Sequence, residues 1–144
     1  MSVVRTDIRD GLGWVTLNRP EVRNALHSYA YAEMRSCWRD IGLDPNIYAG
    51  IVTGAGQAFC AGRDVKFLAQ YQAQGKRTPH EDPNSPLFHW GGGGQPQDVN
   101  LEKPLIAAIN GFAVGVGLNI ILQCQLRVMA DDAWIGDQHT NVGR

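Results

Sequence analysis

The chain has 144 residues, of which 44% are hydrophobic and 19% charged, and its formal net charge at pH 7 is -1. This length suits one hydrophobic core and is too short for two ordinary domains, so we expect residues 1–144 to form a single domain. Lysines and arginines are scattered rather than gathered on one stripe, which argues against nucleic-acid binding. The absence of a signal core or a long apolar run predicts no export and no membrane span, and three cysteines without C-x-x-C spacing fit a reducing cytoplasm.

The N-terminal part of the chain carries a hairpin pattern followed by a helix pattern. Strand-type residues on either side of the Asp10-Gly11 turn predict a hairpin of residues 3–8 and 14–17. From Ser28, a suitable N-cap, apolar residues recur every three or four positions up to Ile41. This spacing predicts an amphipathic helix whose apolar stripe belongs to the core.

Two later segments share the order strand, glycine-rich loop, helix. In the first, a β-branched strand at 51–53 leads to a helix at about 64–70. In the second, a buried strand at 105–109, a turn and a glycine-rich loop lead to an apolar helix at 118–124. Further short strands are expected at 126–130 and 134–135. The alternation predicts an α/β domain.

Residues 75–97 separate these two segments and are rich in Pro, Gly, Gln and His. They include four consecutive glycines, Gly91 to Gly94. We predict a mobile loop, because this composition cannot bury enough apolar surface to order itself easily.

The glycine-rich loops do not match the common phosphate-binding or metal-binding patterns. Phe59 and Ile120 stand where dinucleotide fingerprints need a third glycine, and no G-K-[ST] occurs. His80-Glu81 lacks the second histidine of H-E-x-x-H, so we expect no metal. In both segments, small residues end a strand before a helix begins, which leaves backbone N–H groups free at the positive end of a helix. The two loops are either simple tight connections or an oxyanion site for acyl chemistry.

Three stretches, in this order along the chain, resemble the crotonase, or enoyl-CoA hydratase/isomerase, superfamily. They are "LNRPEVRNAL" at 17–26, "VTGAGQAFCAGRD" at 52–64 and "KPLIAAINGFAVGVGLNIILQCQLRVMADDAWIG" at 103–136. The resemblance implies a spiral of ββα units, here the N-terminal portion of the family fold without the usual C-terminal helical trimerisation part. It implies an acyl-CoA thioester substrate, with coenzyme A as part of the substrate and no other cofactor. It also implies a homo-oligomer, or a partner chain that supplies the missing part.

The same resemblance implies that the backbone N–H groups of Arg63 and Val116 hold the substrate carbonyl oxygen. Val116 stands between two glycines, and a backbone donor needs no particular side chain provided that its dihedral angles are right. The Arg63 side chain turns away from the carbonyl, either towards a CoA phosphate or into solvent. The residues implied to line the CoA arm, the adenine or the oxyanion loops are Arg23, Ala25, Ala61, Gly62, Asp64, Lys66 and Gly115.

The chain departs from the family at both catalytic glutamates, because Asn119 and His139 occupy their positions. A two-glutamate hydratase mechanism is therefore not expected. His139 either transfers protons, with Asp137 orienting it, or is merely solvated; an imidazole pKa near 6.5 suits the first role. Asn119 either holds a water or the substrate by its amide, or caps a helix or lines the core.

We therefore expect an acyl-CoA enzyme whose lyase, isomerase or hydrolase-type chemistry passes through an enolate or a tetrahedral oxyanion. The alternative is a non-catalytic or incomplete CoA-binding domain that needs a second chain. Cys60 precedes the first oxyanion loop, but a cysteine in an apolar turn is commonly inert, and we interpret it as buried packing. Four residues of the predicted loop are further candidates for contact with the acyl group, and the two aromatic ones favour a flat or bulky group: His80, His89, Phe88 and Trp90.

Overall fold

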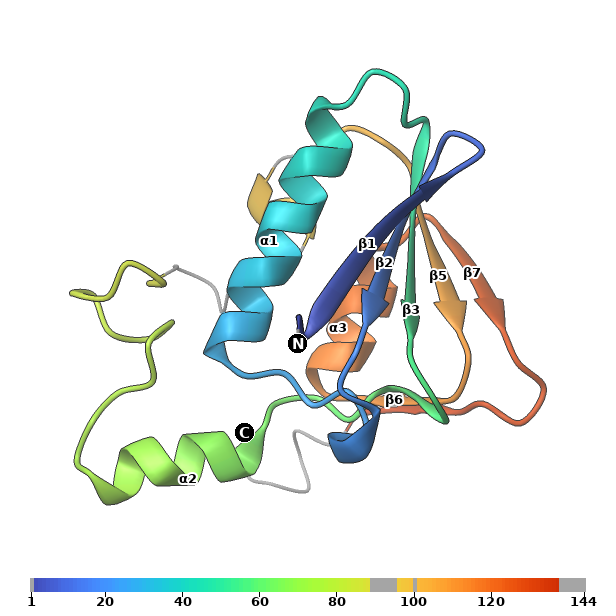
Figure 1. The fold of residues 1–144 in the computed structure, drawn as a ribbon. Coiled ribbons are helices and arrows are strands. Elements are labelled where there is room, and N and C mark those ends of the chain that lie inside the picture. Colours follow the sequence, from blue (N-terminus) through green and yellow to red (C-terminus); the bar gives the residue numbers. More distant parts are fainter. Residues whose placement is uncertain (1, 89–95, 100, 138–144) are drawn as a thin grey trace.

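The computed structural model describes residues 2–88, 96–99 and 101–137 (Figure 1). This part of the chain forms one five-stranded sheet, in the order β1-β2-β3-β5-β7, and one three-stranded sheet, in the order β4-β6-β8. The strands are β1 (Val4–Arg9), β2 (Leu12–Leu17), β3 (Ala49–Gly54), β4 (Ala58–Cys60), β5 (Leu105–Ile109), β6 (Phe112–Val114), β7 (Leu126–Met129) and β8 (Ile135–Gly136). The α-helices are α1 (Ser28–Leu43), α2 (Val65–Ala73) and α3 (Val116–Gln123), and the short 3₁₀ helices are η1 (Pro20–Val22) and η2 (Pro96–Val99).

The sheets are parallel except at the N-terminal hairpin. Strands β1 and β2 pair antiparallel through a turn at Asp10 and Gly11, which both have positive φ. The pairs β2–β3, β3–β5 and β5–β7 are parallel, as are β4–β6 and β6–β8. Each of the strand pairs β3/β4, β5/β6 and β7/β8 thus sends one strand to each sheet, in the same order. This repetition confirms the predicted α/β spiral.

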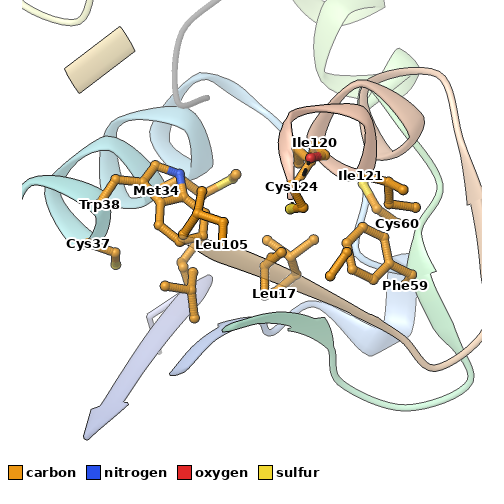
Figure 2. Packing of buried hydrophobic residues seen from close by; sticks show 14 of the residues in the cluster. Leu17, Met34, Cys37, Trp38, Phe59, Cys60, Leu105, Ile120, Ile121 and Cys124 are labelled. Carbon is orange, nitrogen blue, oxygen red and sulfur yellow. Dashed lines mark hydrogen bonds between the residues drawn. The ribbon is translucent and has the colours of Figure 1, made fainter. Parts of the chain in front are cut away.

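The core lies between the large sheet and helices α1 and α3 (Figure 2). The apolar stripe of α1 is buried as predicted, and Trp38 and Met34 are fully covered. Leu17 and Leu105 face them from the sheet, and Ile120 and Ile121 join from α3 (Figure 2). The core therefore fixes the start of α3 relative to the ends of the strands.

The prediction of loops at both glycine-rich segments is wrong where β4 and β6 lie. Each of these strands has three residues, too few for a period-two pattern to stand out from a loop. Helix α3 begins at Val116, two residues earlier than predicted, and α2 continues to Ala73.

The predicted N-cap of α1 is also wrong by one residue. The His27 side chain accepts a hydrogen bond from the Ala30 N–H at 3.1 Å and caps the helix. Ser28 is the first helical residue, and it is buried.

Within residues 75–97, the structure describes part of the segment predicted to be a mobile loop. Thr78 and His80 are 1% and 6% exposed, so this part of the segment packs against the domain. Its mobility stays a prediction. Among the described helices, none has the length and apolarity needed to cross a membrane.

Candidate active site

The two glycine-rich loops pack directly against each other. Gly62 follows β4 and has φ +85°, and Gly115 follows β6 and has φ +53°. Residues other than glycine rarely adopt such backbone angles. A Cβ atom built on Gly62 would lie 3.0 Å from the carbonyl oxygen of Val114 and 3.6 Å from the backbone nitrogen of Val116. A Cβ on Gly117 would lie 2.7 Å from the carbonyl oxygen of Cys60. The structure thus brings together the loops that carry Arg63 and Val116.

The backbone N–H of Arg63 points away from Leu26, the residue that holds this loop on its other side. Leu26 donates its N–H to the carbonyl oxygen of Gly62 at 2.8 Å, and Asp64 donates its N–H to the carbonyl oxygen of Leu26 at 2.8 Å. Because a trans peptide is planar, the Arg63 N–H lies on the side opposite to the Gly62 carbonyl. No described residue accepts a hydrogen bond from this N–H.

The backbone N–H of Val116 is free for a different reason. Val116 is the first residue of α3, and the first hydrogen bond of this helix runs from the Asn119 N–H to the carbonyl oxygen of Gly115, at 3.1 Å. The leading N–H groups of a helix have no intrahelical acceptor, and they lie at its positive end. Within the part of the chain that the structure describes, nothing else accepts the Val116 N–H. Two unpaired donors therefore stand on touching loops.

The Arg63 side chain is held by protein groups. Its Nη2 lies 2.6 Å from Oε1 of Glu81 and 3.5 Å from the Thr78 hydroxyl. Thr78 donates a short hydrogen bond to the other Glu81 oxygen, and its hydroxyl lies 3.3 Å from Nδ1 of His80. The same His80 nitrogen lies 2.8 Å from the Ser28 hydroxyl. The guanidinium is thus committed to Glu81, and the expected contact with a CoA phosphate stays a prediction.

These contacts set the charges of the cluster. Burial alone would raise the pKa of Glu81, but hydrogen bonds from Thr78 and Arg63 and the charge of Arg63 outweigh it and lower that pKa. Burial, followed by the charge of Arg63, lowers the pKa of His80. The cluster therefore favours a carboxylate at 81 and a neutral imidazole at 80.

Asp64 and Ala25, two residues implied to line the CoA site, bind Arg19. Asp64 caps α2 by accepting the Phe67 N–H at 3.0 Å, and it pairs with Arg19 at 2.9 Å. Arg19 also donates to the carbonyl oxygen of Ala25 at 2.6 Å. Burial would raise the pKa of Asp64, but these hydrogen bonds and the Arg19 charge lower it overall. The sequence interpretation missed Arg19, because its partner Asp64 lies 45 positions away.

The sequence interpretation also missed Asn24, which anchors β4 and the turn before it. Its buried side chain donates to the carbonyl oxygens of Ala55 and Ala58 and accepts the Arg19 N–H. The carbonyl oxygen of neighbouring Arg23 accepts the Ala61 N–H at 2.9 Å. Arg23 and Asn24 both have positive φ, which asparagine tolerates well, so the pair in "PEVRNAL" was the available signal.

Arg23 also borders a cleft of about 600 Å³. The cleft is lined by Pro20, Glu21, Arg23, Gly56, Gln57, Ala58 and Phe112. Lys66 lies on the exposed first turn of α2. Both cations are placed where an anion could reach them, and their contact with CoA phosphates stays a prediction.

Of the three predicted proton-transfer residues, the structure describes Asp137 and Asn119. Val114 pairs with Gly136, so Asp137, directly after β8, follows a strand that lies beside β6. Asn119 lies half-buried in the first turn of α3. His139 lies outside the described residues, as do His89 and Trp90, so their roles stay predictions.

Cys60 is buried, and burial raises the pKa of its thiol to about 12. Its sulfur donates to the carbonyl oxygen of Asn24 and accepts the Gly62 N–H, each at 3.3 Å. The interpretation of Cys60 as buried packing is confirmed.

Comparison with known proteins gives the family. A model of the family Enoyl-CoA hydratase/isomerase matches residues 7–144. The chain is 35% identical over 134 residues to (E)-benzylidenesuccinyl-CoA hydratase of Thauera aromatica, covering 92% of this chain and 49% of that protein. It is 33% identical over 141 residues to hydroxycinnamoyl-CoA hydratase-lyase of Pseudomonas fluorescens, covering 97% of this chain and 50% of that protein. The chain thus spans about half the length of the curated relatives it matches.

Solved structures give the same answer. An enoyl-CoA hydratase from Mycobacterium smegmatis aligns with a TM-score of 0.76 at 31% identity, over 99% of this chain and 53% of that one. An enoyl-CoA hydratase/isomerase from Mycobacterium paratuberculosis aligns with a TM-score of 0.84 at 24% identity, over the same shares, and shows the shared fold. The chain therefore belongs to the crotonase, or enoyl-CoA hydratase/isomerase, family.

Proposed function

We propose that this chain binds an acyl-CoA thioester, with the thioester carbonyl oxygen between the backbone N–H groups of Arg63 and Val116. The observation that carries the proposal is the pair of unpaired donors on the touching loops after β4 and β6. Family membership supports the class of substrate, and the relatives named above are a hydratase and a hydratase-lyase of CoA thioesters.

The chemistry follows from the donors. Negative charge develops on the carbonyl oxygen when a proton leaves the α-carbon or when a nucleophile adds to the carbonyl carbon. Removing one such preorganised donor costs an enzyme about 3 kcal/mol of transition-state stabilisation. The reaction accordingly passes through an enolate or a tetrahedral oxyanion.

Proton transfer is assigned to His139, assisted by Asp137 or Asn119. Asn119 cannot ionise, so the two-glutamate hydration route is excluded for these two positions. Asp137 directly follows β8, whose parallel pairing with β6 puts Asp137 at the same end of the sheet as the second donor loop, and this supports its part in the proposal. A panel of enoyl-, β-ketoacyl- and aryl-CoA thioesters, with His139→Ala beside the unmodified chain, tests this role. Equal turnover by both proteins would rule it out.

The donor assignment is tested by Val116→Pro. Proline at the first position of a helix removes the N–H without removing an intrahelical hydrogen bond. Val116→Ala is the matched control, because it trims the side chain and keeps the donor. We expect Val116→Pro to lower kcat about 10²- to 10³-fold and Val116→Ala to change it little. Equal effects of both substitutions would contradict the assignment.

A second candidate function is a CoA-binding domain that requires another polypeptide to complete it. Several apolar side chains near the ends of α3, β7 and β8 are at least 46% exposed: Leu122, Leu126, Val128, Trp134 and Ile135. Large apolar side chains left this exposed support contact with a further polypeptide. Native mass measurement together with a turnover assay distinguishes the two candidates. A lone chain that binds CoA without turnover supports the second candidate, and turnover by a lone chain rejects it.

A further inference from the structure

A cluster of polar side chains packs beside the loop that carries the first proposed donor. It comes from the first turn of α1, from the loop after β4 and from the segment after α2, and its members are Ser28, Tyr31, Arg63, Thr78, His80 and Glu81. Tyr31, Thr78, His80 and Ser28 are all buried. Polar groups removed from water in this way normally pair with one another.

Every member of this polar cluster except one has a hydrogen-bond partner within it. Glu81 uses one oxygen for Arg63 and the other for Thr78. Nδ1 of His80 meets the hydroxyls of Ser28 and Thr78. Tyr31 contacts His80 only through its ring, edge-on, with 5.0 Å between the ring centroids.

The Tyr31 hydroxyl is the exception. Its residue is 4% exposed, and no hydrogen bond to this hydroxyl comes from any residue that the structure describes. A buried phenol without a partner is costly, and natural proteins seldom keep one that serves no purpose.

The phenol lies close to the first donor loop. Its electrostatic neighbours are Arg63 and Asp64 in that loop, Cys60 at the end of β4, and Glu81. Burial raises the pKa of Tyr31 above its usual value, so the group stays protonated and able to donate. None of the cluster's hydrogen bonds involves the Tyr31 hydroxyl, so its donor is open to a group that arrives with a ligand.

We propose that the Tyr31 hydroxyl donates a hydrogen bond to an oxygen of the acyl group, beyond the thioester carbonyl, and so selects oxygen-bearing acyl groups. This inference rests on the proposed function, because the ligand is the thioester held by Arg63 and Val116. Tyr31 is then a specificity-determining residue. A site built to donate to an oxygen discriminates against the analogue that lacks it, since the buried donor is left unpaired.

The test compares Tyr31→Phe with the unmodified chain on two matched pairs of thioesters, 3-hydroxybutyryl-CoA with butyryl-CoA and hydroxybenzoyl-CoA with benzoyl-CoA. Dissociation constants are measured by calorimetry, with Tyr48→Phe as control because Tyr48 is 73% exposed and lies just before β3. We expect the unmodified chain to prefer one oxygenated thioester over its plain partner by about tenfold, and Tyr31→Phe to lose that preference. The thermal midpoint of ligand-free Tyr31→Phe should equal or exceed that of the unmodified chain, because an unpaired buried hydroxyl is removed.

Three results would overturn the inference. The first is binding of all four thioesters without preference, and the second is an equal loss of affinity for both members of a pair in Tyr31→Phe. The third is a lower thermal midpoint for ligand-free Tyr31→Phe, which would give the hydroxyl a structural role. Failure of the unmodified chain to bind any CoA thioester would instead reject the proposed function, while the thermal midpoint would still decide whether the hydroxyl stabilises the ligand-free fold.

Discussion

Replacement of Asn24 by alanine should destabilise the domain more than any other single change to a polar side chain near the donor loops. The Asn24 amide group donates at 2.9 Å to Ala55 and at 2.8 Å to Ala58, and its oxygen accepts the Arg19 N–H at 2.9 Å. Its side chain is 1% exposed, so the groups left behind are largely shielded from water.

The magnitude follows from these contacts. Three hydrogen bonds contribute about 1 kcal/mol each, and the backbone groups left unpaired add up to about 1 kcal/mol in total, which gives roughly 3–4 kcal/mol. Asn24 has φ +58°, and alanine at this angle adds about 1 kcal/mol. We therefore expect Asn24→Ala to cost about 4–5 kcal/mol in the free energy of unfolding, and Asn24→Gly about 1 kcal/mol less because glycine adopts positive φ freely.

Urea unfolding followed by tryptophan fluorescence measures both values. With a urea slope of about 2 kcal/mol per M, Asn24→Ala should lower the midpoint by about 2 M. Asn46→Ala is the control: Asn46 is exposed and bonds only locally to Asp44, so it should change stability by less than about 0.5 kcal/mol. A loss below about 1 kcal/mol for Asn24→Ala would refute the reasoning on hydrogen bonds, and equal losses for alanine and glycine would refute the reasoning on φ.

Two further predictions concern acid and thiol chemistry. The lowered pKa of His80 favours its neutral form, so the stability that this group contributes should be fully present above the ordinary histidine pKa of about 6.5 and should be lost as the pH falls below it. The pKa values of Asp64 and Glu81 are also lowered, so protonation of these carboxylates should extend the loss of stability through the acidic range. Thermal unfolding from pH 8 to pH 4 measures this, and His80→Gln should flatten the upper part of the curve; a midpoint that rises on acidification would contradict the assignment. Cys60, with its buried thiol and a pKa of about 12, should resist iodoacetamide in the native protein and react after denaturation, as read by peptide mass spectrometry; rapid native labelling would reopen a nucleophilic role.

The sequence was most informative where a pattern repeats over many residues. The α1 stripe runs over four turns, so its burial could be read from spacing alone. The hairpin was predictable because its strands flank a turn dipeptide that favours positive φ. The resemblance then supplied the order of the remaining units.

The details of the site depend on contacts between residues far apart in the chain. Arg63 and Glu81 are 18 positions apart, and Ser28 and His80 are 52 apart, with no periodic pattern joining them. Such pairs form only after the helices and strands have packed, and a single sequence contains no signal for them. Strands β4 and β6 were missed for a related reason, since strands this short are defined by their pairing partners.

The pairing of β4 with β6 has a consequence for how this family can diverge. The proposed donors follow β4 and β6, which are neighbours in one sheet, and neighbouring strands lie about 4.8 Å apart whatever their side chains are. The distance between the two donors is therefore set by main-chain hydrogen bonding. Evolution can change the side chains at 63 and 116 without moving the backbone N–H groups. The constraint falls on Gly62 and Gly117, where an added Cβ would meet the facing backbone. Reaction specificity can therefore change while the backbone frame of the proposed donors stays in place.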